Sequence, residues 1–192
     1  MPLTVCTWNI NSVRLREGLV AHLLDSQAPD ILCLQETKSP VDKIPTEAFE
    51  ALGYAHRVAR GDKGYNGVAI LSRQPLEEVP HTDFCDKGDA RHVAARHASG
   101  LLVHNLYVPA GGDEPDPEKN PKFDHKLRFV EEMGRVFAEA PGAQVLVGDL
   151  NIAPGEDDVW SHKQLLKIVS HTPQEVERFE AARVAGGWHD AV

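Results

Sequence analysis

The sequence predicts an α/β protein with a single domain over residues 1–192. Short apolar runs with the length of buried strands alternate with segments in which apolar residues recur every three or four positions, as they do in helices. The length suits one domain with a sizeable core, and 42% hydrophobic with 26% charged residues is ordinary for a globular protein. Several strand-like runs end in polar residues, and open α/β sheets gather their ligands at such strand ends.

Strands are expected where apolar or alternating residues form short runs. These runs are residues 3–8, 30–34, 54–59, 67–72, 75–79, 92–96, 101–108 and 145–147. The middle of the chain is therefore predicted to be rich in β-structure.

Helices are expected at residues 14–26, 122–138 and 172–184. The apolar face of the first comprises Leu15, Leu19, Val20, Leu23 and Leu24. The stripe of the second comprises Phe123, Leu127, Val130, Met133 and Phe137, and it favours a place in the core over a cofactor site. Pro29 stops the first helix, whereas Thr172 can cap the third and Pro173 fits its first turn.

The most informative motif is Gly148-Asp149-Leu150-Asn151-Ile152, directly after the apolar run Val145-Leu146-Val147. It places a carboxylate and an amide two positions apart, on one face of an extended segment. Gly148 has no side chain, so a ligand could approach the backbone there. Such residues usually form only a turn, so the motif by itself is a weak signal.

Three other strand-like runs also end in polar side chains, namely Asn9, Glu36 and Tyr107. Turn chemistry does not readily explain all these endings together. Taken singly, Glu36 could be a surface carboxylate and Tyr107 a core tyrosine with a satisfied hydroxyl. Carboxylate and amide oxygens suit Mg²⁺ or Mn²⁺ rather than zinc, because no Cys/His cluster accompanies them.

Five short motifs together resemble the exonuclease III family in order and spacing. They are Trp8-Asn9-Ile10-Asn11-Ser12-Val13-Arg14, Leu34-Gln35-Glu36-Thr37-Lys38, Tyr65-Asn66-Gly67-Val68-Ala69-Ile70-Leu71, Leu106-Tyr107-Val108-Pro109 and Gly148-Asp149-Leu150-Asn151-Ile152-Ala153-Pro154. That family comprises bacterial apurinic/apyrimidinic endonucleases of the endonuclease–exonuclease–phosphatase superfamily. The resemblance runs from residue 3 to the last residue. It implies a four-layered α/β/β/α sandwich (DNase I-like), which the hydrophobic pattern alone does not show.

The resemblance also implies roles for individual residues. Asp149 looks like the general base, and Tyr107 and Asn151 look like groups that hold the scissile phosphate. Glu36 looks like the ligand of Mg²⁺ (or Mn²⁺), with Asn9, Asp149 and Asn151 contributing to the same metal site. The implied reaction is cleavage of double-stranded DNA 5′ to abasic sites, with 3′-to-5′ exonuclease action that trims 3′ ends and leaves a 3′-hydroxyl.

Contacts with DNA are harder to predict, because a net charge of −9 argues mildly against a binder with a basic surface. Divalent cations can supply positive charge at an acidic site. A candidate DNA-contacting loop contains the basic residues Arg57, Arg60, Lys63 and Arg73, and the aromatic Tyr65. A solvated charged connection explains this segment equally well. By resemblance, Arg91 is expected on the DNA side.

The chain departs from the family pattern at its end, Gly187-Trp188-His189-Asp190-Ala191-Val192. The resemblance implies further family segments: an aromatic segment that lines the abasic-site pocket, an Asp in a core strand and an Asp–His pair. None has a counterpart here, so the domain is expected to lack its C-terminal part. Asp190 and His189 stand in the reverse order and in another segment, and they inherit no role. Ala110 stands where better-known members carry an amide.

Three functions fit these sequence features. They are a Mg²⁺-dependent DNA repair nuclease, a truncated inactive relative that binds metal or DNA only weakly, and a phosphatase acting on a small phosphoester. Residues 1–4 carry neither a basic nor an apolar targeting signal, so a cytoplasmic protein is expected. A monomer is expected as well. Cys6 and Cys33 fall inside strand-like runs and are expected to be buried, reduced thiols.

Overall fold

The computed structural model describes residues 2–138 and 142–191, so Met1 and Val192, the ends of the predicted domain, lie outside it. Two compact units make up the chain. The first holds Met1–Asp83, Lys87–Tyr107 and Gly142–Asp149, and the second holds Phe84–Asp86, Val108–Pro141 and Leu150–Val192. The single domain over residues 1–192 stays a prediction.

The first unit contains a sheet of four strands in the order β1-β2-β4-β3. Its strands are β1 (Val5–Asn9), β2 (Ile31–Gln35), β3 (His56–Asp62) and β4 (Tyr65–Ser72). Strands β1 and β2 run parallel, and β4 pairs antiparallel with both β2 and β3. The register Asn9↔Gln35 and Gln35↔Val68 therefore brings the carboxyl ends of β1 and β2 beside the start of β4.

A second sheet of the same unit has the order β5-β6-β7-β8. Its strands are β5 (Leu76–Val79), β6 (His92–His97), β7 (Leu102–Tyr107) and β8 (Gln144–Asp149). Only β7 and β8 are parallel, and their register sets Tyr107 directly beside Asp149. All the predicted strands are present, with ends that differ by a few residues from those expected.

Gly148 lies opposite Leu106 in this register, and its backbone has a φ of 148°. A Cβ atom placed there would lie 1.9 Å from the carbonyl oxygen of Leu106. The prediction that Gly148 leaves room for a ligand is therefore wrong, because the backbone of β7 occupies that space. The glycine is needed for strand packing.

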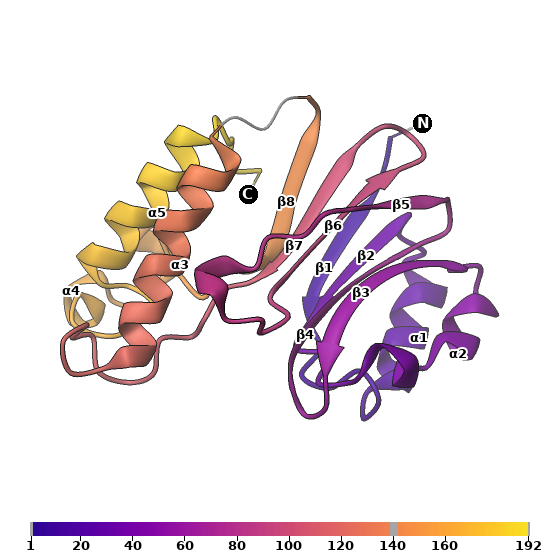
Figure 1. Ribbon diagram of the computed structural model, residues 1–192, viewed down its shortest axis with the longest axis horizontal. Coiled ribbons are helices and arrows are strands. Elements are labelled where there is room, and N and C mark those ends of the chain that lie inside the picture. The colour runs from indigo at the N-terminus through magenta and orange to yellow at the C-terminus, as the bar shows by residue number, and fades with distance from the viewer. Residues whose placement is uncertain (1, 139–141, 192) are drawn as a thin grey trace. The chain divides into compact units, whose positions relative to one another are not determined.

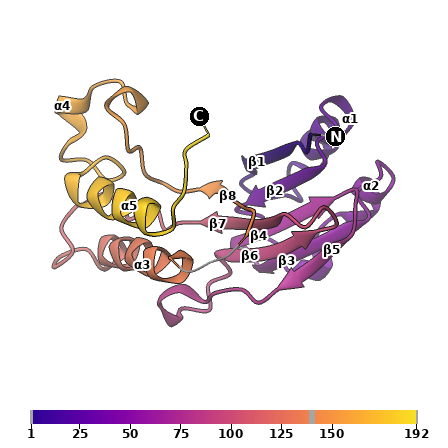
Figure 2. The same ribbon diagram turned by 90° about the horizontal axis from the view of Figure 1, so that it is seen from above.

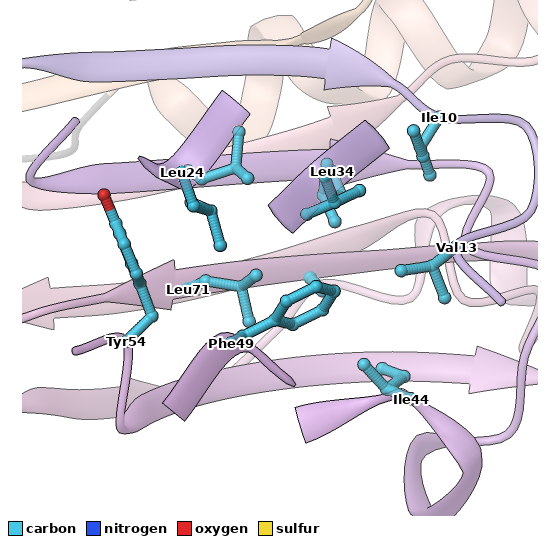
Figure 3. Packing of buried hydrophobic residues seen from close by; sticks show 11 residues of the cluster. Ile10, Val13, Leu24, Leu34, Ile44, Phe49, Tyr54 and Leu71 are labelled. Atoms are coloured by element: carbon cyan, nitrogen blue, oxygen red, sulfur yellow. The ribbon is translucent and has the colours of Figure 1, made fainter. Parts of the chain in front are cut away.

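The apolar core of the first unit has two parts. Between the sheets, residues of β2, β3 and β4 meet Val93, Ala95 and Val103 of the second sheet. On the other face of the first sheet lie α1 (Glu17–Ser26) and α2 (Thr46–Glu50), and α2 was not predicted (Figure 1). Figure 3 shows Phe49 and Tyr54 packed with Leu24, Leu34 and Leu71 in this outer cluster.

The predicted apolar face of the first helix is only partly correct. Val20 and Leu24 are fully buried, whereas Leu15 is 83% and Leu19 55% exposed. Residues 13–16 form a turn, so α1 begins at Glu17, three positions later than expected. Leu15 consequently precedes the helix, and Leu19 lies one residue away from the buried face set by the i, i+4 pair Val20 and Leu24.

The second unit is built on α3 (Pro121–Phe137), α4 (His162–Leu165) and α5 (Pro173–Ala185). Figure 2 shows α3 and α5 side by side. Gly134 lies at this contact, and a Cβ atom there would lie 3.2 Å from the Cα of Ala182. The whole predicted stripe of α3 is buried, which confirms its place in the core.

The start of α5 also agrees with the sequence. The Thr172 side chain accepts a hydrogen bond from the backbone N–H of Glu175, and Pro173 occupies the first turn. The Glu175 carboxylate in turn accepts a hydrogen bond from the Thr172 backbone N–H, which completes a capping box that was not predicted. Within residues 2–138 and 142–191, none of the helices combines the length and apolar character that a membrane span requires. Cys6, Cys33 and Cys85 are free thiols; Cys33 is buried and Cys6 only partly so.

Candidate active site

Polar side chains from both sheets of the first unit meet at one edge. Asn9 ends β1, Glu36 follows β2, Tyr107 ends β7 and Asp149 ends β8. These residues are joined by hydrogen bonds, although as many as 140 positions separate them along the chain. The structure thus brings together the residues that the sequence placed at separate strand ends.

Asn9 lies at the centre of this cluster. Its Nδ2 donates to Glu36 Oε1 at 2.9 Å and to Asp149 Oδ2 at 2.7 Å, while its Oδ1 accepts from the Asn11 backbone N–H at 3.1 Å. One amide therefore bridges two carboxylates that belong to different sheets. In this arrangement Asn9 orients the carboxylates through its nitrogen, and its predicted role as an oxygen ligand of the metal stays a prediction.

Glu36 receives donors on both of its carboxylate oxygens. Oε1 also accepts from the Tyr107 hydroxyl at 2.9 Å, and Oε2 forms an ion pair with Lys38 Nζ at 2.7 Å. Burial acts to raise the pKa of Glu36, but the hydrogen bonds from Asn9, Lys38 and Tyr107 outweigh it and hold the pKa below its usual value. The carboxyl group is therefore ionised at neutral pH. Lys38 was missed by the sequence reasoning, although it stands two residues after Glu36 in the same motif.

The backbone at Glu36 is unusual, with a φ of 52° in the left-handed region. The first residues of β4 support it. The N–H groups of Thr37 and Lys38 donate to the carbonyls of Gly67 and Asn66, at 3.1 and 2.8 Å. A Cβ atom on Gly67 would lie 2.1 Å from Thr37 Oγ1, so only glycine allows this approach. The Asn66-Gly67 motif thus fixes the turn that presents Glu36.

Tyr107 is positioned by Arg91. The guanidinium stacks on the tyrosine ring at 4.7 Å and donates to the Tyr107 carbonyl at 3.1 Å, while Asp89 accepts from Arg91 Nε at 2.6 Å. Burial, followed by the hydrogen bond to Glu36, raises the pKa of Tyr107, so the phenol stays protonated and acts as a donor. Arg91 is only 8% exposed. The structure therefore gives it a supporting contact with Tyr107, and its contact with DNA stays a prediction.

The candidate DNA-contacting loop is a tight β-hairpin, not a loop. Lys63 and Gly64 form the turn between β3 and β4, and Tyr65 beside it is 67% exposed. The register pairs Tyr65 with Asp62 at this tip and His56 with Ser72 at the far end. Arg57 and Arg73 belong to the far end, where Arg73 stacks on Tyr54, and Arg60 donates to the His92 carbonyl. Of the predicted group, only Lys63 and Tyr65 lie at the tip. The backbone N–H of Gly64 donates to the Lys38 carbonyl, and this bond holds the tip beside the turn that contains Glu36.

Asn151 belongs to the second unit, and its place in a site with Asp149 stays a prediction. Its φ of 52° is left-handed, and its Nδ2 donates to the Val108 carbonyl at 2.9 Å. This bond links the loop after β8 to the loop after β7.

The cluster fits a hard divalent cation. Glu36 and Asp149 offer carboxylate oxygens from adjoining strand ends, and Mg²⁺ is commonly bound by one or two carboxylates while it keeps several waters. Within the described part of the chain, no group of three or more His, Cys, Asp or Glu side chains forms a denser metal cage. The donor set therefore suits Mg²⁺ or Mn²⁺ better than zinc.

Comparison with known proteins agrees with this geometry. The Endonuclease/Exonuclease/phosphatase family matches residues 6–190. The chain belongs to this family. Exodeoxyribonuclease III of Haemophilus influenzae is 30% identical over 158 residues, which cover 80% of this chain and 59% of that protein. Membership of the exonuclease III branch, which the five sequence motifs predicted, is thereby confirmed.

Two similar solved structures confirm the predicted fold, a mixed α/β protein with two sheets. An AP endonuclease from Archaeoglobus fulgidus superposes with a TM-score of 0.86 at 34% identity, over 94% of this chain and 70% of that one. A 3′ phosphatase, NExo, from Neisseria, bound to a product DNA hairpin, gives a TM-score of 0.87 at 33% identity, over 96% and 71%. The chain therefore spans about six tenths of the Haemophilus protein and seven tenths of these two structures.

Proposed function

We propose that this chain carries the catalytic carboxylates of a divalent-metal-dependent DNA repair nuclease. It would cleave double-stranded DNA 5′ to abasic sites and trim 3′ ends, with Mg²⁺ or Mn²⁺ as the cofactor. The observation that carries the proposal is the Asn9 amide, which joins Glu36 and Asp149 across the two sheets. Membership of a family of nucleases and phosphatases, and likeness to exodeoxyribonuclease III, support the same reaction. A monomeric, cytoplasmic protein is part of the proposal on sequence grounds.

Within this proposal each side chain of the cluster has a distinct task. Glu36, held ionised by its donors, would be the main metal ligand, and a bound cation would offset negative charge on the phosphate and on the leaving 3′-oxygen. Asp149 would accept the proton of the attacking water, because its Oδ2 is already oriented by Asn9. Tyr107, as a protonated donor, would hold Glu36 or a phosphate oxygen. Asn151 would hold the scissile phosphate, while Lys63 and Tyr65 would contact the DNA backbone.

A 3′ phosphatase activity on DNA ends is the second candidate. The Neisseria structure, named as a 3′ phosphatase with a product DNA hairpin, favours it over a phosphatase for a small phosphoester. In both reactions water attacks a phosphorus atom that carries a 3′-oxygen, so the same carboxylates would serve either reaction. The substrate end, a phosphomonoester or a phosphodiester, separates the two.

The decisive experiment measures turnover on labelled duplexes with Mg²⁺. One duplex carries an abasic site, one an unmodified 3′ end and one a 3′-phosphate. Asp149→Asn is expected to lose several orders of magnitude in kcat while DNA binding is retained or tightened, since the change removes a base and a negative charge but keeps the shape. The exposed carboxylate Asp42 on the same unit provides a matched control, and Asp42→Asn is expected to keep full activity.

Metal binding is tested separately by titration calorimetry with Mn²⁺. Wild type and Asp42→Asn are expected to bind, and Glu36→Ala is expected to lose most of that binding. Near wild-type turnover in Asp149→Asn would remove Asp149 as the base, and equal Mn²⁺ binding by Glu36→Ala would remove Glu36 from the metal site. Metal binding without turnover on any duplex would favour the inactive relative that only binds metal or DNA.

A further inference from the structure

The second unit contains a buried charge that the sequence pattern did not single out. Lys126 lies on α3 between the predicted core positions Phe123 and Leu127, and its side chain is 0% exposed. Its ammonium forms an ion pair with Glu175, which is also 0% exposed. A buried lysine is rare unless it is paired, so these two side chains must be considered together.

Glu175 is held in a fixed orientation by the start of α5. Both of its carboxylate oxygens accept from the Ser170 backbone N–H at 2.9 Å. One of them also accepts from the Thr172 hydroxyl at 2.7 Å and from the Thr172 backbone N–H at 3.1 Å. The capping box therefore presents a rigid anion to Lys126.

The ammonium of Lys126 also binds two loops. It donates to the Asn151 carbonyl at 2.6 Å and contacts the Ala110 carbonyl at 3.3 Å. The stem of Lys126 runs under Gly111, where a Cβ atom would lie 2.9 Å from its Cδ. One side chain thus fastens the loop after β7 and the loop after β8 to the start of α5.

Asn151 is consequently held at two points. Lys126 binds its carbonyl, and its own Nδ2 binds the Val108 carbonyl in the other loop. Its φ of 52° is left-handed, a conformation that asparagine tolerates better than most residues and that these two contacts hold in place. A buried ion pair is weak evidence for added stability, because apolar residues of similar volume often replace one without loss. The arrangement points to orientation of Asn151 as the use of this pair.

We propose that Lys126, anchored by Glu175, is a positioning residue that sets the backbone and the side-chain amide of Asn151 for phosphate binding. This inference rests on the proposed function of Asn151. It assigns to the second unit a part in the reaction that does not require Lys126 to touch the substrate.

The test separates stability from positioning. Lys126→Met alone leaves Glu175 as an unpaired buried anion, so it is expected to lower both thermal stability and turnover. The double variant Lys126→Met/Glu175→Met removes both charges and is expected to regain part of the lost stability, because Glu175→Met also gives up the hydrogen bonds from Ser170 and Thr172. Its kcat is nevertheless expected to stay about 10- to 100-fold below wild type, a loss of the size seen when the hydrogen-bonded partner of a metal ligand is removed. KM for DNA is expected to change much less than kcat.

Val130→Ala, a buried truncation on the same helix, provides the control. It is expected to lower stability but to leave kcat unchanged at a temperature where it is folded. Combining Asn151→Ala with the double Met variant is expected to lower kcat no more than Asn151→Ala does alone. The effects of Val130→Ala and Asn151→Ala on kcat, in contrast, should be independent of each other. Full kcat in the double Met variant, or additivity with Asn151→Ala, would overturn the inference.

A readout without turnover keeps the inference testable if no DNA substrate is cleaved. The side-chain amide resonances of Asn151, identified by their loss in Asn151→Ala, are expected to shift in the double Met variant and not in Val130→Ala. Inactivity of wild type would then count against the proposed function alone. An unshifted Asn151 amide would count against the positioning role.

Discussion

Asn105 offers the sharpest test of how the first unit holds its site together. It lies on β7, is 0% exposed and reaches from the second sheet to the first. Its Nδ2 donates to the Leu34 carbonyl at 3.0 Å and to the Ala69 carbonyl at 2.9 Å. Its Oδ1 accepts from Gln35 Nε2 at 2.7 Å. Glu36 directly follows β2 and Tyr107 ends β7, so these bonds fix the spacing between the two strand ends of the candidate site.

Replacing Asn105 with Leu keeps the approximate volume and removes all of these bonds. Each buried polar group left without its partner costs about 1–3 kcal/mol, although Gln35 retains other acceptors. The expected loss in the free energy of unfolding is therefore about 3–5 kcal/mol, a large part of the roughly 5–15 kcal/mol available to a domain. The melting temperature should fall by roughly 10 °C for a chain of this size.

The assay is urea denaturation followed by circular dichroism, with thermal melts in parallel. Val103→Ala is the matched control, because Val103 is buried on the same face of β7 two residues away. Loss of its methyl groups should cost about 1–2 kcal/mol through transfer and cavity effects. If Asn105→Leu loses no more stability than Val103→Ala, the buried hydrogen bonds contribute nothing net and the reasoning is refuted.

The remaining predictions concern pH, strand packing and the phenol. Burial and the nearby His104 lower the pKa of His92 to about 3, and burial lowers the pKa of His104 to about 4. Both side chains therefore stay neutral in the folded protein, whereas in the unfolded chain they bind protons below pH 6.5. The free energy of unfolding should thus fall as the pH drops below 6.5, by roughly 2 kcal/mol per histidine at pH 5. Urea midpoints measured against pH should fall less steeply in His104→Gln than in wild type. A pH-independent wild type would contradict this. Gly148→Ala should destabilise by several kcal/mol, because its Cβ meets the Leu106 carbonyl, and an unchanged melting temperature would contradict the close approach of β7 and β8. Tyr107→Phe should reduce kcat by about 100-fold with the fold intact by circular dichroism, and undiminished turnover would exclude a role for the hydroxyl.

The sequence by itself determined features that depend on neighbours along the chain. Alternation and short apolar runs predicted every strand, and the spacing of Phe123, Leu127 and Val130 predicted the buried stripe of α3. Thr172 followed by Pro173 predicted the start of α5. These signals are local, because the period of a helix or strand and the chemistry of a cap are set within a few residues.

The tertiary structure alone decided which strand ends meet and what each polar group binds. The contact of Asn9 with Asp149 depends on strand order and on the facing of two sheets, and neither leaves a mark in local periodicity. The exposure of individual side chains was also decided by the tertiary structure. Leu15 and Leu19 satisfy a helical pattern yet face solvent, whereas Lys126 interrupts an apolar stripe and is buried. Lys126 is buried because Glu175, nearly fifty residues later, supplies its charge partner. Such pairing is a property of three-dimensional packing. A residue-by-residue pattern therefore predicted the strands and the three long helices, but not the short helices α2 and α4 or the contacts that assemble the candidate site.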